Sequence, residues 1–591
     1  MGISINVKKV IFLGVAAFLI VGSSHLLLRY YVDDFISYPD NFHVENSNSP
    51  QKSSSGTNYG NKVILEPIPS PPPSIVGRPT FGLIKADKTH DFWYQVFAVF
   101  KNHRFKVKEE EELLKSVPES EQEDPTSFTK ESLLGKMIIK DEYLQQVKEK
   151  HANVVNQLPN EIDPATYKKD SKGVVVLGGG FYSWLAYLAI LQLRESGSEM
   201  PVELVLPDYK DYENEFDFCE TTLPKLNTKC VVLRTLLGAE VVNEWKFGSY
   251  QYKILALLVS SFQHVFLLDS DNAVVSNPDR IWDSEVYKKH GLILWPDYWR
   301  RSVSPLFYDI ANLTVDESTR VRIGRFPLYQ PQPVSPGEKI EYHELKGTIP
   351  DLSTESGQVI VNKKSHGKML LVALYYNIFG PEFFYKLLGS GELGTGDKDT
   401  FITAAAATQS TYYQVKGYIR TLGYGDKKGY HGMSMAQKDP IQDYAILKEQ
   451  YKEAHSLLKK GKQNWDIELQ KSKIDELKDK YFNADSKDID IFTLHCNINK
   501  IDPTRYREQE DLNEGNERMN HRMFSNFKYM VDGKYVDFEW KRWSNIHNAL
   551  CTQKIDFAHF RDKQQDMEAT CKYAANTINW LSSNSKVVNT H

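Results

Sequence analysis

The 591-residue chain has little excess charge of either sign and few cysteines. Lys and Arg number 72 against 77 Asp and Glu, so the formal net charge is -5, without the basic excess typical of nucleic-acid-binding proteins. Five cysteines do not make a disulfide scaffold, and the odd number leaves at least one thiol without an intramolecular partner. Cys219 with Cys230, and Cys551 with Cys571, are plausible local pairs that the sequence leaves open. The 41% hydrophobic and 25% charged content is that of an ordinary globular protein.

The chain also lacks the common glycine signatures of nucleotide sites. Val174–Leu177 is a short apolar run followed by Gly178, Gly179 and Gly180. This is neither Gly-x-Gly-x-x-Gly nor a Walker loop, which needs Gly-Lys-Ser/Thr. Three glycines after a strand still permit close approach of the backbone to a ligand, and ligands of such sheets bind at the carboxyl ends of strands. We therefore expect a ligand near this loop.

One long hydrophobic run is present, at residues 10–28, and it carries no formal charge. Its length is close to the ~20 residues that cross a bilayer as a helix. Lys8 and Lys9 precede it and favour a cytoplasmic N-terminus, residues 1–9. A cleavable signal peptide is the alternative, but its apolar core is usually shorter. We expect an uncleaved signal anchor that places the rest of the chain in a lumen or outside the cell.

The composition indicates four further segments of the chain. Residues 29–84 include stretches rich in Ser, Asn, Gly and Pro and indicate a stem linker. Residues 85–170 are charged and locally helix-like, which favours a helical neck, and residues 171–591 would form the catalytic domain. Within it, 442–488 is highly charged with helical spacing and indicates a helical insertion. Asn312 begins Asn-Leu-Thr, a sequon that could be glycosylated in a lumen.

Short apolar runs alternate with helix-like stretches from residue 171 onward. This β–loop–α–β alternation predicts an α/β fold with a mixed, mostly parallel sheet. The expected strands are 174–177, 202–206, 229–233 and 264–268, and the expected helices between them are 182–194 and 250–260.

A pair of acidic residues follows the strand expected at His264–Leu268. The strand runs directly into Asp269, Ser270 and Asp271. Ionised carboxylates are costly to bury unless they are paired or bound to a metal. Two of them could hold Mg²⁺ or Mn²⁺ while the phosphates of a substrate fill the other positions. A strand that merely ends in a polar turn is the alternative, and the glycine loop at a matching strand end favours the nucleotide site.

Several blocks of the sequence together resemble a known family. The Asp-x-Asp block resembles the core of retaining, nucleotide-sugar-dependent glycosyltransferases of the GT-A fold. The full set resembles the fungal Golgi α-mannosyltransferases of N-linked outer-chain mannan, and among them the α-1,2-mannosyltransferases that branch the α-1,6-mannose backbone. The resemblance covers about residues 170–505 and the type II membrane layout. The blocks are GGGFYSWLA, the Asp-x-Asp segment, WPDYWRR, ESGQVIVNK, GDKDTF, MAQKDP and HCNINK.

The resemblance implies a metal and donor site. Asp269 and Asp271 would be the metal pair and His495 the third ligand. Imidazole suits Mn²⁺ better than Mg²⁺, so the implied metal is Mn²⁺. Lys253 would face the nucleotide diphosphate, and Ser270 would belong to the same nucleotide-binding set. Gly178, Gly179 and Gly180 would lie by the base and ribose.

The resemblance also implies which residues surround the donor sugar. Asp397 and Asp399 match carboxylates near that sugar, and Glu355 and Gln358 match the turn that flanks it. Asp399, Asp397 and Glu355 are therefore the candidate catalytic residues. Retention of the α configuration of GDP-mannose allows double displacement through a carboxylate nucleophile, or front-face substitution in which the leaving phosphate takes the acceptor proton. The sequence leaves both routes open, with Asp399 as the candidate nucleophile or stabiliser of the cationic sugar.

Three other functions are alternatives to mannosyl transfer. Haloacid-dehalogenase phosphatases also use a strand and Asp-x-Asp, but normally place Thr or Val where this chain has Ala273. A non-catalytic Golgi glycan-binding or scaffold protein would have lost the metal acids, which are present. A terminal α-1,3-mannosyltransferase of the same broad family remains, because linkage depends on acceptor loops.

The resemblance implies partners and a location as well. The donor would be GDP-mannose, the acceptor α-1,6-mannan of an N-glycan, and no nucleic acid would bind. The chain would be a single-pass type II protein of the Golgi membrane with a lumenal catalytic domain, and a Golgi mannosyltransferase complex is a candidate assembly.

Overall fold

The computed structural model describes residues 87–584 except 110, 125, 391–394 and 499. The expected cytoplasmic tail at 1–9, anchor at 10–28 and stem at 29–84 lie outside the described residues. Within the described part, no helix is long and apolar enough to span a membrane.

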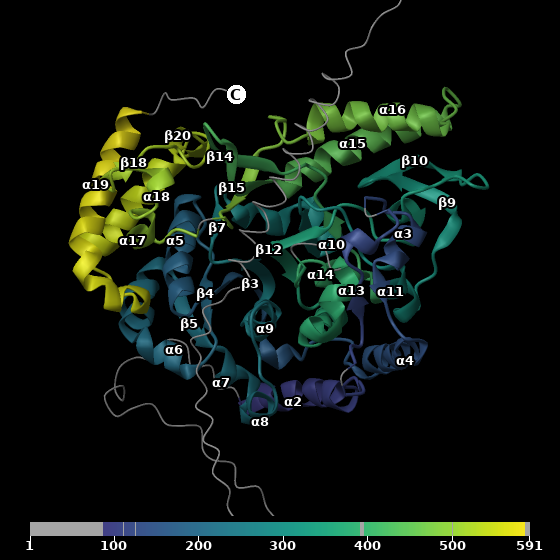
Figure 1. Cartoon of the computed structure of the whole chain (residues 1–591), viewed down its shortest axis with the longest axis horizontal. Coiled ribbons are helices and arrows are strands. Elements are labelled where there is room, and N and C mark those ends of the chain that lie inside the picture. Colours follow the sequence, from purple (N-terminus) through teal and green to yellow (C-terminus); the bar gives the residue numbers. More distant parts are fainter. Residues whose placement is uncertain (1–86, 110, 125, 391–394, 499, 585–591) are drawn as a thin grey trace, which may run out of the picture. The chain divides into compact units, whose positions relative to one another are not determined.

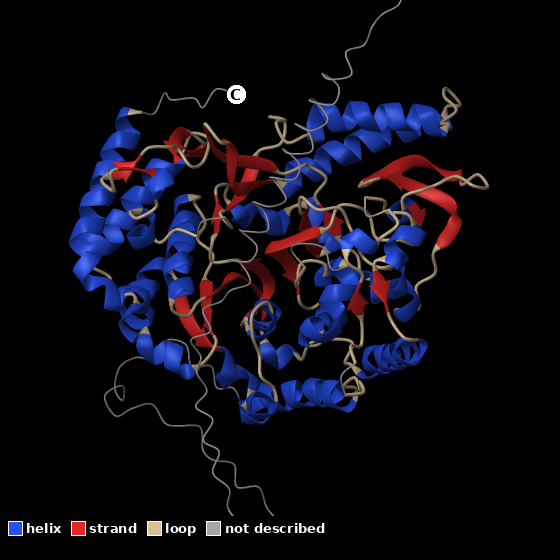
Figure 2. Cartoon of the chain, in the orientation of Figure 1, coloured by secondary structure: helices blue, strands red, loops and turns tan. Residues whose placement is uncertain are grey.

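Strands lie at the centre, with helices around them (Figures 1 and 2). The central sheet has seven strands in the order β13-β8-β12-β6-β3-β4-β5. β6, β3, β4 and β5 pair in parallel, as do β13 and β8, whereas β12 is antiparallel to both of its neighbours. The predicted α/β fold with a mixed, mostly parallel sheet is thus confirmed. The strands are β3 Lys168–Leu177, β4 Val202–Leu206, β5 Thr228–Val232, β6 Phe262–Leu268, β8 Leu292–Pro296, β12 Thr354–Asn362 and β13 Tyr413–Gln414.

Helices cover both faces of this sheet because its strands are apolar on both faces. Val175 and Leu267 contribute to one hydrophobic core, and Val176 and Leu268 contribute to the other, as expected for alternating side chains. The first core includes α9 Gln251–Val259, α12 Gly367–Ile378 and α14 Thr400–Ala407. The second includes α5 Phe181–Glu195, α18 Phe538–His547 and α19 Met567–Ser583.

The residues expected to form a neck, 85–170, pack into the first core where they are described. Phe100 lies against Tyr375 and Phe379 of the α12 region, and His151 Nε2 is 2.8 Å from Tyr376 Oη. This segment therefore shares the core of the sheet instead of preceding it as a separate subdomain. Its elements are α2 Asp87–Asn102, β1 Lys115–Ser116, α3 Lys130–Gly135, β2 Met137–Ile138 and α4 Asp141–Gln157.

A second sheet, with order β14-β15-β16-β7, lies next to the Asp-x-Asp segment. Its strands are β7 Asn272–Val274, β14 Arg420–Asp426, β15 Gly429–Lys438 and β16 Ile491–His495. β16 is antiparallel to β7, and His495 is opposite Asn272. This register brings the end of β16 to the residues that follow β6.

Two helices, α15 Pro440–Lys459 and α16 Ile467–Leu477, occupy the expected insertion. They leave β15 and return to its neighbour β16, and α15 packs on β10 through Tyr451 and Tyr329, whose ring centroids are 4.7 Å apart. The remaining elements are β9 Asp316–Ile323, β10 Phe326–Pro333, β11 Leu345–Lys346, α6 Tyr209–Asn214, α7 Leu233–Leu237, α8 Ala239–Glu244, α10 Glu285–His290, α11 Pro305–Ile310, α13 Tyr385–Gly389, α17 Pro503–Tyr506, β17 Asn513–Glu514, β18 Arg518–Met519, β19 Lys528–Val531 and β20 Lys534–Asp537.

The cysteines pair as the local spacing suggested. Cys219 bonds to Cys230 and Cys551 bonds to Cys571. Cys496 is unpaired and buried beside His495 in the chain.

Candidate functional site

Three potential metal ligands converge at the carboxyl end of β6. Asp269 and Asp271 follow that strand, and His495 is the last residue of β16. His495 Nε2 is 3.2 Å from Asp271 Oδ1 and 3.9 Å from Asp269 Oδ2. One ligand atom from each residue lies within 4.8 Å of the others. The structure thus brings together the three residues predicted to bind metal.

Glu355 of β12 lies on the other side of the imidazole. Its Oε1 is 2.8 Å from His495 Nδ1, so the ring is held between carboxylates. Burial lowers the pKa of His495, but Asp271 and Glu355 raise it more, and the pKa is well above the usual value. A carboxylate behind a metal-binding histidine fixes its orientation and raises its basicity. Glu355, predicted as catalytic, therefore has the geometry of a positioning residue.

Gly357 leaves the space in which Glu355 and His495 meet. A Cβ atom at this position would collide with the Glu355 carboxylate and the His495 ring. The Gly357 carbonyl accepts a hydrogen bond from the Asp269 amide at 2.8 Å. Glu355, Gly357 and Gln358 lie within strand β12 and not in the expected turn, and the glycine links this strand to the start of the Asp-x-Asp segment.

Lys253 of α9 contacts the first carboxylate. Its Nζ is 3.1 Å from Asp269 Oδ2, 3.3 Å from Asp397 Oδ2 and 2.9 Å from Ser356 Oγ. Burial lowers the pKa of Lys253, but Asp269 and Asp397 raise it by a larger amount. The net pKa is above the usual value, so the ammonium group remains charged. The predicted diphosphate-facing lysine is therefore part of the site.

Lys500 contacts the second carboxylate and was not predicted from the sequence. Its Nζ is 3.1 Å from Asp271 Oδ2 and 5.2 Å from the centre of the Tyr182 ring. Burial lowers the pKa of Lys500, and the greater effect of Asp271 raises it above the usual value. Lys500 ends the HCNINK block, five positions after His495, but its contact with Asp271 was not predicted.

The glycine loop lies at the end of the strand next to β6. Val176 of β3 is in register with Leu268, so Gly178 and Asp269 follow adjacent strand ends. Gly179 and Gly180 have φ values of 106° and 55°, which L-residues with side chains rarely adopt. The Gly179 amide donates to Ser183 Oγ at 2.8 Å. The loop joins β3 to α5, whose Tyr182 packs on Lys500.

The two predicted carboxylates near the sugar occupy different surroundings. Asp397 contacts Lys253, and burial raises the pKa of Asp397. Asp399 Oδ1 instead accepts hydrogen bonds from Arg301 Nη1 at 2.7 Å and from the amide and hydroxyl of Thr354, both at 2.8 Å. Arg301 is fully buried. Asp397 therefore faces the lysine of the site, whereas Asp399 braces the segment before Glu355.

The remaining predicted residues are placed as follows. Gln358 is fully buried, and its Oε1 accepts hydrogen bonds from Asn272 and, at 3.0 Å, from Thr493. It thus holds β12 against β7 and β16. Ser270 is buried between the two metal-site carboxylates in the sequence, and Asn312 is exposed in the turn after α11.

Sequence comparison with known proteins shows the family of this chain. The chain is 43% identical over 519 residues to alpha-1,2-mannosyltransferase MNN23 of Candida albicans, an alignment of 83% of this chain and 84% of the relative. The chain belongs to the fungal alpha-1,2-mannosyltransferase family. It is 34% identical to MNN5 of Saccharomyces cerevisiae, over 75% of this chain and 79% of that protein. The model of the family described as “Mannosyltransferase putative” matches residues 171–439.

Membership of the alpha-1,2-mannosyltransferase family makes this protein a glycosyltransferase, so the phosphatase and scaffold alternatives are wrong. Solved structures with some similarity include the galactosyltransferase LgtC, at 10% identity over 42% of this chain and 75% of that one, with a TM-score of 0.24. The glycosyltransferase GlyE of Streptococcus pneumoniae is 12% identical over 42% of this chain and 46% of that one, with a TM-score of 0.23. The two sheets and the helices that cover them define the fold.

Proposed function

We propose that this protein transfers mannose from GDP-mannose to the α-1,6-mannose backbone of N-linked outer-chain mannan and forms α-1,2 bonds with retention of configuration. The names of the relatives support the linkage and the sugar. The observation that carries the proposal is the convergence of Asp269, Asp271 and His495 with two lysines at the carboxyl edge of the sheet. This is the chemistry that a sugar diphosphate requires.

The donor atoms of the trio fit a divalent cation. Two carboxylates and one imidazole offer two oxygens and a nitrogen, a set that favours Mn²⁺ over Mg²⁺. Asp269, Asp271 and His495 would hold the ion, and Glu355 would orient the imidazole. When bound, Mn²⁺ would supply positive charge to the diphosphate.

The two lysines have a role of their own in the transfer. Lys253 and Lys500 each lie beside one carboxylate of the trio and remain charged. Their ammonium groups would stabilise the negative charge that develops on the diphosphate as the glycosidic bond breaks. Charge fixed in place before the reaction contributes most in a site that excludes water.

Asp397 is the carboxylate that we assign to the reacting sugar. It is buried and in contact with Lys253, whereas Asp399 is committed to Arg301 and Thr354. Asp397 would balance the positive charge that develops on mannose, or would be the nucleophile if the reaction is a double displacement. Asp399 would act indirectly, by positioning the strand that carries Glu355.

We also propose the setting of the reaction. The catalytic unit has a GT-A-like fold, and the charge-free segment 10–28 and the stem 29–84 hold it in the Golgi lumen as a type II protein. The exposed sequon at Asn312 is then a glycosylation site. Association with other mannosyltransferases in a Golgi complex is part of this proposal.

A donor panel tests the function. Detergent-solubilised full-length protein with Mn²⁺ and α-1,6-mannobiose is given GDP-mannose, GDP-fucose or UDP-glucose, and the product is measured by mass spectrometry. We expect transfer of mannose alone, and at least a hundredfold loss of rate on Asp271→Asn. Asp283→Asn is the matched control, since this carboxylate is 80% exposed. Transfer from another donor, or an active Asp271→Asn, would overturn the assignment.

A further inference from the structure

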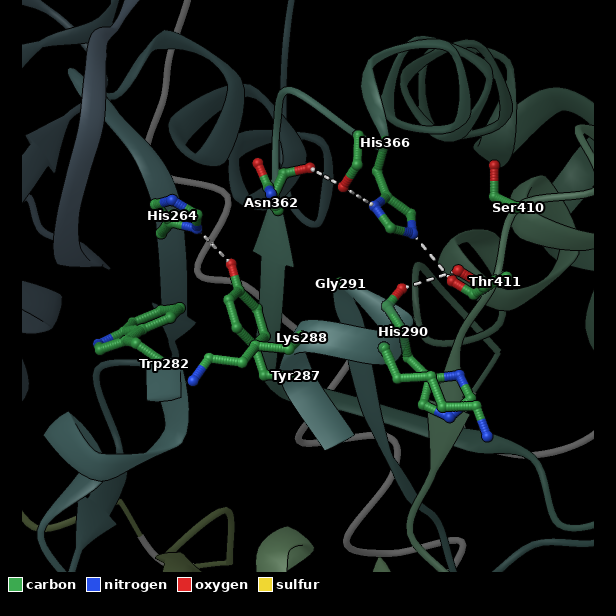
Figure 3. Close-up of a pocket in the computed structure, with 12 residues that line it drawn as sticks. His264, Trp282, Tyr287, Lys288, His290, Gly291, Asn362, His366, Ser410 and Thr411 are labelled. Atoms are coloured by element: carbon green, nitrogen blue, oxygen red, sulfur yellow. Dashed lines mark hydrogen bonds between the residues drawn. The ribbon is translucent and has the colours of Figure 1, made fainter. Parts of the chain in front are cut away.

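A cavity of about 390 Å³ lies at the edge of the central sheet opposite the Asp-x-Asp segment (Figure 3). Three of its lining residues lie at strand ends on this edge of the sheet. His264 is near the start of β6, Gly291 directly precedes β8, and Asn362 is the last residue of the antiparallel β12. Asp269 follows the other end of β6. The cavity therefore shares no residue with the candidate active site.

The lining of this cavity is positive or neutral throughout. Lys288 and Lys289 of α10 line it, together with the imidazoles of His264, His290 and His366. No carboxylate and no aliphatic side chain is among the described residues that line it. The absence of carboxylates disfavours a cation, and the absence of aliphatic groups disfavours an apolar ligand. Ammonium groups suit an anion. Lys289 Nζ also donates to Tyr444 Oη at 3.1 Å, and Lys288 Nζ is 3.9 Å from Asp283 Oδ1, both outside the lining.

Two of the imidazoles are already fixed in place. His366 Nδ1 is 2.8 Å from Ser365 Oγ, and His366 Nε2 is 2.8 Å from the Thr411 carbonyl oxygen. His264 Nδ1 is 2.7 Å from Tyr287 Oη. Figure 3 shows His264 and Tyr287 on one side of the cavity and His366 and Thr411 on the other. Because these side chains are already held in place, binding of a ligand would cost little conformational entropy.

The third imidazole lacks a hydrogen-bond partner, although its ring packs against Tyr413 and Tyr444. Both ring nitrogens of His290 are buried and have no hydrogen bond among the described residues. Burial lowers the pKa of His290, and the neighbouring Lys289 and Lys416 lower it further, which reports a positive local potential. A ligand that accepts hydrogen bonds and carries negative charge would satisfy both conditions.

We propose that this cavity binds a phosphate group, with Lys288, Lys289 and His290 as its anion-binding residues. The volume exceeds that of a bare ion and lies within the range of small-molecule sites. Trp282 and Tyr287, which also line the cavity, would flank the organic group that bears the phosphate. A nucleoside monophosphate and a phosphorylated sugar share this chemistry. The inference is independent of the proposed transfer reaction.

Calorimetry on the full-length solubilised protein tests the site. GMP, mannose 6-phosphate and inorganic phosphate are the probes, and methyl α-mannoside is the neutral comparison. We expect Lys288→Gln with Lys289→Gln to raise the Kd of at least one phosphate compound tenfold or more. The matched control is Lys364→Gln with Lys448→Gln, which removes the same charge from two exposed lysines outside the cavity. Mannosyl transfer should be unchanged in both.

A second variant tests the cavity itself. Ser365 is exposed at the rim, so Ser365→Trp should fill the space without loss of folding and should also weaken phosphate binding. Weakened GMP binding alone would identify a nucleotide ligand, and weakened mannose 6-phosphate binding alone a phosphorylated sugar. No binding by the wild type, equal affinity in cavity and control variants, or binding of methyl α-mannoside alone would overturn the proposal.

Discussion

His495 is held by two carboxylates that have different tasks. Asp271 shares with it the face that would bind the cation, whereas Glu355 contacts only the opposite ring nitrogen. Removal of such a supporting carboxylate commonly costs a metal site ten- to a hundredfold in affinity or activity. The charge of Glu355 should therefore matter most when metal is scarce.

We expect Glu355→Gln to raise the Mn²⁺ concentration for half-maximal transfer by roughly tenfold or more. Much of the rate should return at saturating Mn²⁺, because Glu355 acts through His495. Metal titration of the initial rate is the measurement, and Glu341→Gln, a partly exposed carboxylate that pairs with Arg300, is the control. An equal loss of rate at every Mn²⁺ concentration would show instead that Glu355 acts on the sugar.

Asp399 gives the second prediction at this scale. Its ion pair with Arg301 is buried, and breaking a buried pair by removing one partner typically costs about 3–5 kcal/mol. We expect Asp399→Asn and Arg301→Gln each to lower the free energy of unfolding and the transfer rate together. The double variant should lose much less than the sum, as measured by denaturant unfolding. A fully stable but inactive Asp399→Asn would restore Asp399 as a catalytic residue.

Local sequence was sufficient for some of these residues and insufficient for others. The apolar run before Asp269 and Asp271 predicts that both carboxylates follow a strand end. His495 was joined to them only by the family resemblance, because β6 and β16 belong to different sheets. Lys500 lies in a loop whose course depends on contacts with Tyr182 and Asp271, so no spacing rule locates it. The sequence likewise did not show the partners of Gln358 and Asp399, because Thr493 and Arg301 are distant from them along the chain.

At the scale of elements, the antiparallel pairing of β7 with β16 assembles the site. The register His495 opposite Asn272 places the imidazole beside the residue that directly follows Asp271. The insertion does not disturb this register, because α15 and α16 leave β15 and return to the adjacent β16. The alternating strands and helices could be predicted from apolar periodicity, but a pairing across more than two hundred residues could not.

The sequence also did not predict that α4 packs on α12. Charged surface positions of α4 suggested a separate neck, yet its buried residues include Tyr143, Val147 and Val154. His151, on the same face, is 2.8 Å from Tyr376 Oη, and burial lowers the pKa of His151 to about 4. This contact makes the attachment of the helix sensitive to pH.

The sign of that dependence follows from the pKa values. The pKa of His151 is lower in the folded state than its usual 6.5, so the unfolded state takes up the proton first as the pH falls. The contribution of the neutral ring is complete above about pH 6.5 and is lost as the pH falls toward 4. We expect His151→Phe to reduce the loss of unfolding free energy between pH 7.5 and 5 by about 2 kcal/mol. Exposed His455→Phe is the control in urea titrations, and identical pH slopes for wild type and His151→Phe would contradict this account.

For the molecule as a whole, two hydrophobic cores share one sheet. Residues that alternate along β3 and β6 face different cores, and the loops after these strands carry the glycines and the carboxylates. Burial on both faces keeps the strand ends rigid, which a metal–diphosphate site requires. Composition and periodicity predicted this architecture, because nearly continuous apolar strands occur only where helices cover both faces.

The linkage of the product tests the central claim most directly. Full-length protein, GDP-mannose, Mn²⁺ and an α-1,6-mannobiose acceptor should give a product whose new bond is read by two-dimensional NMR. We expect an anomeric proton with α configuration and a correlation to carbon 2 of the acceptor mannose. A bond to carbon 3 would support the terminal α-1,3-mannosyltransferase instead, and a β configuration would contradict retention at this site.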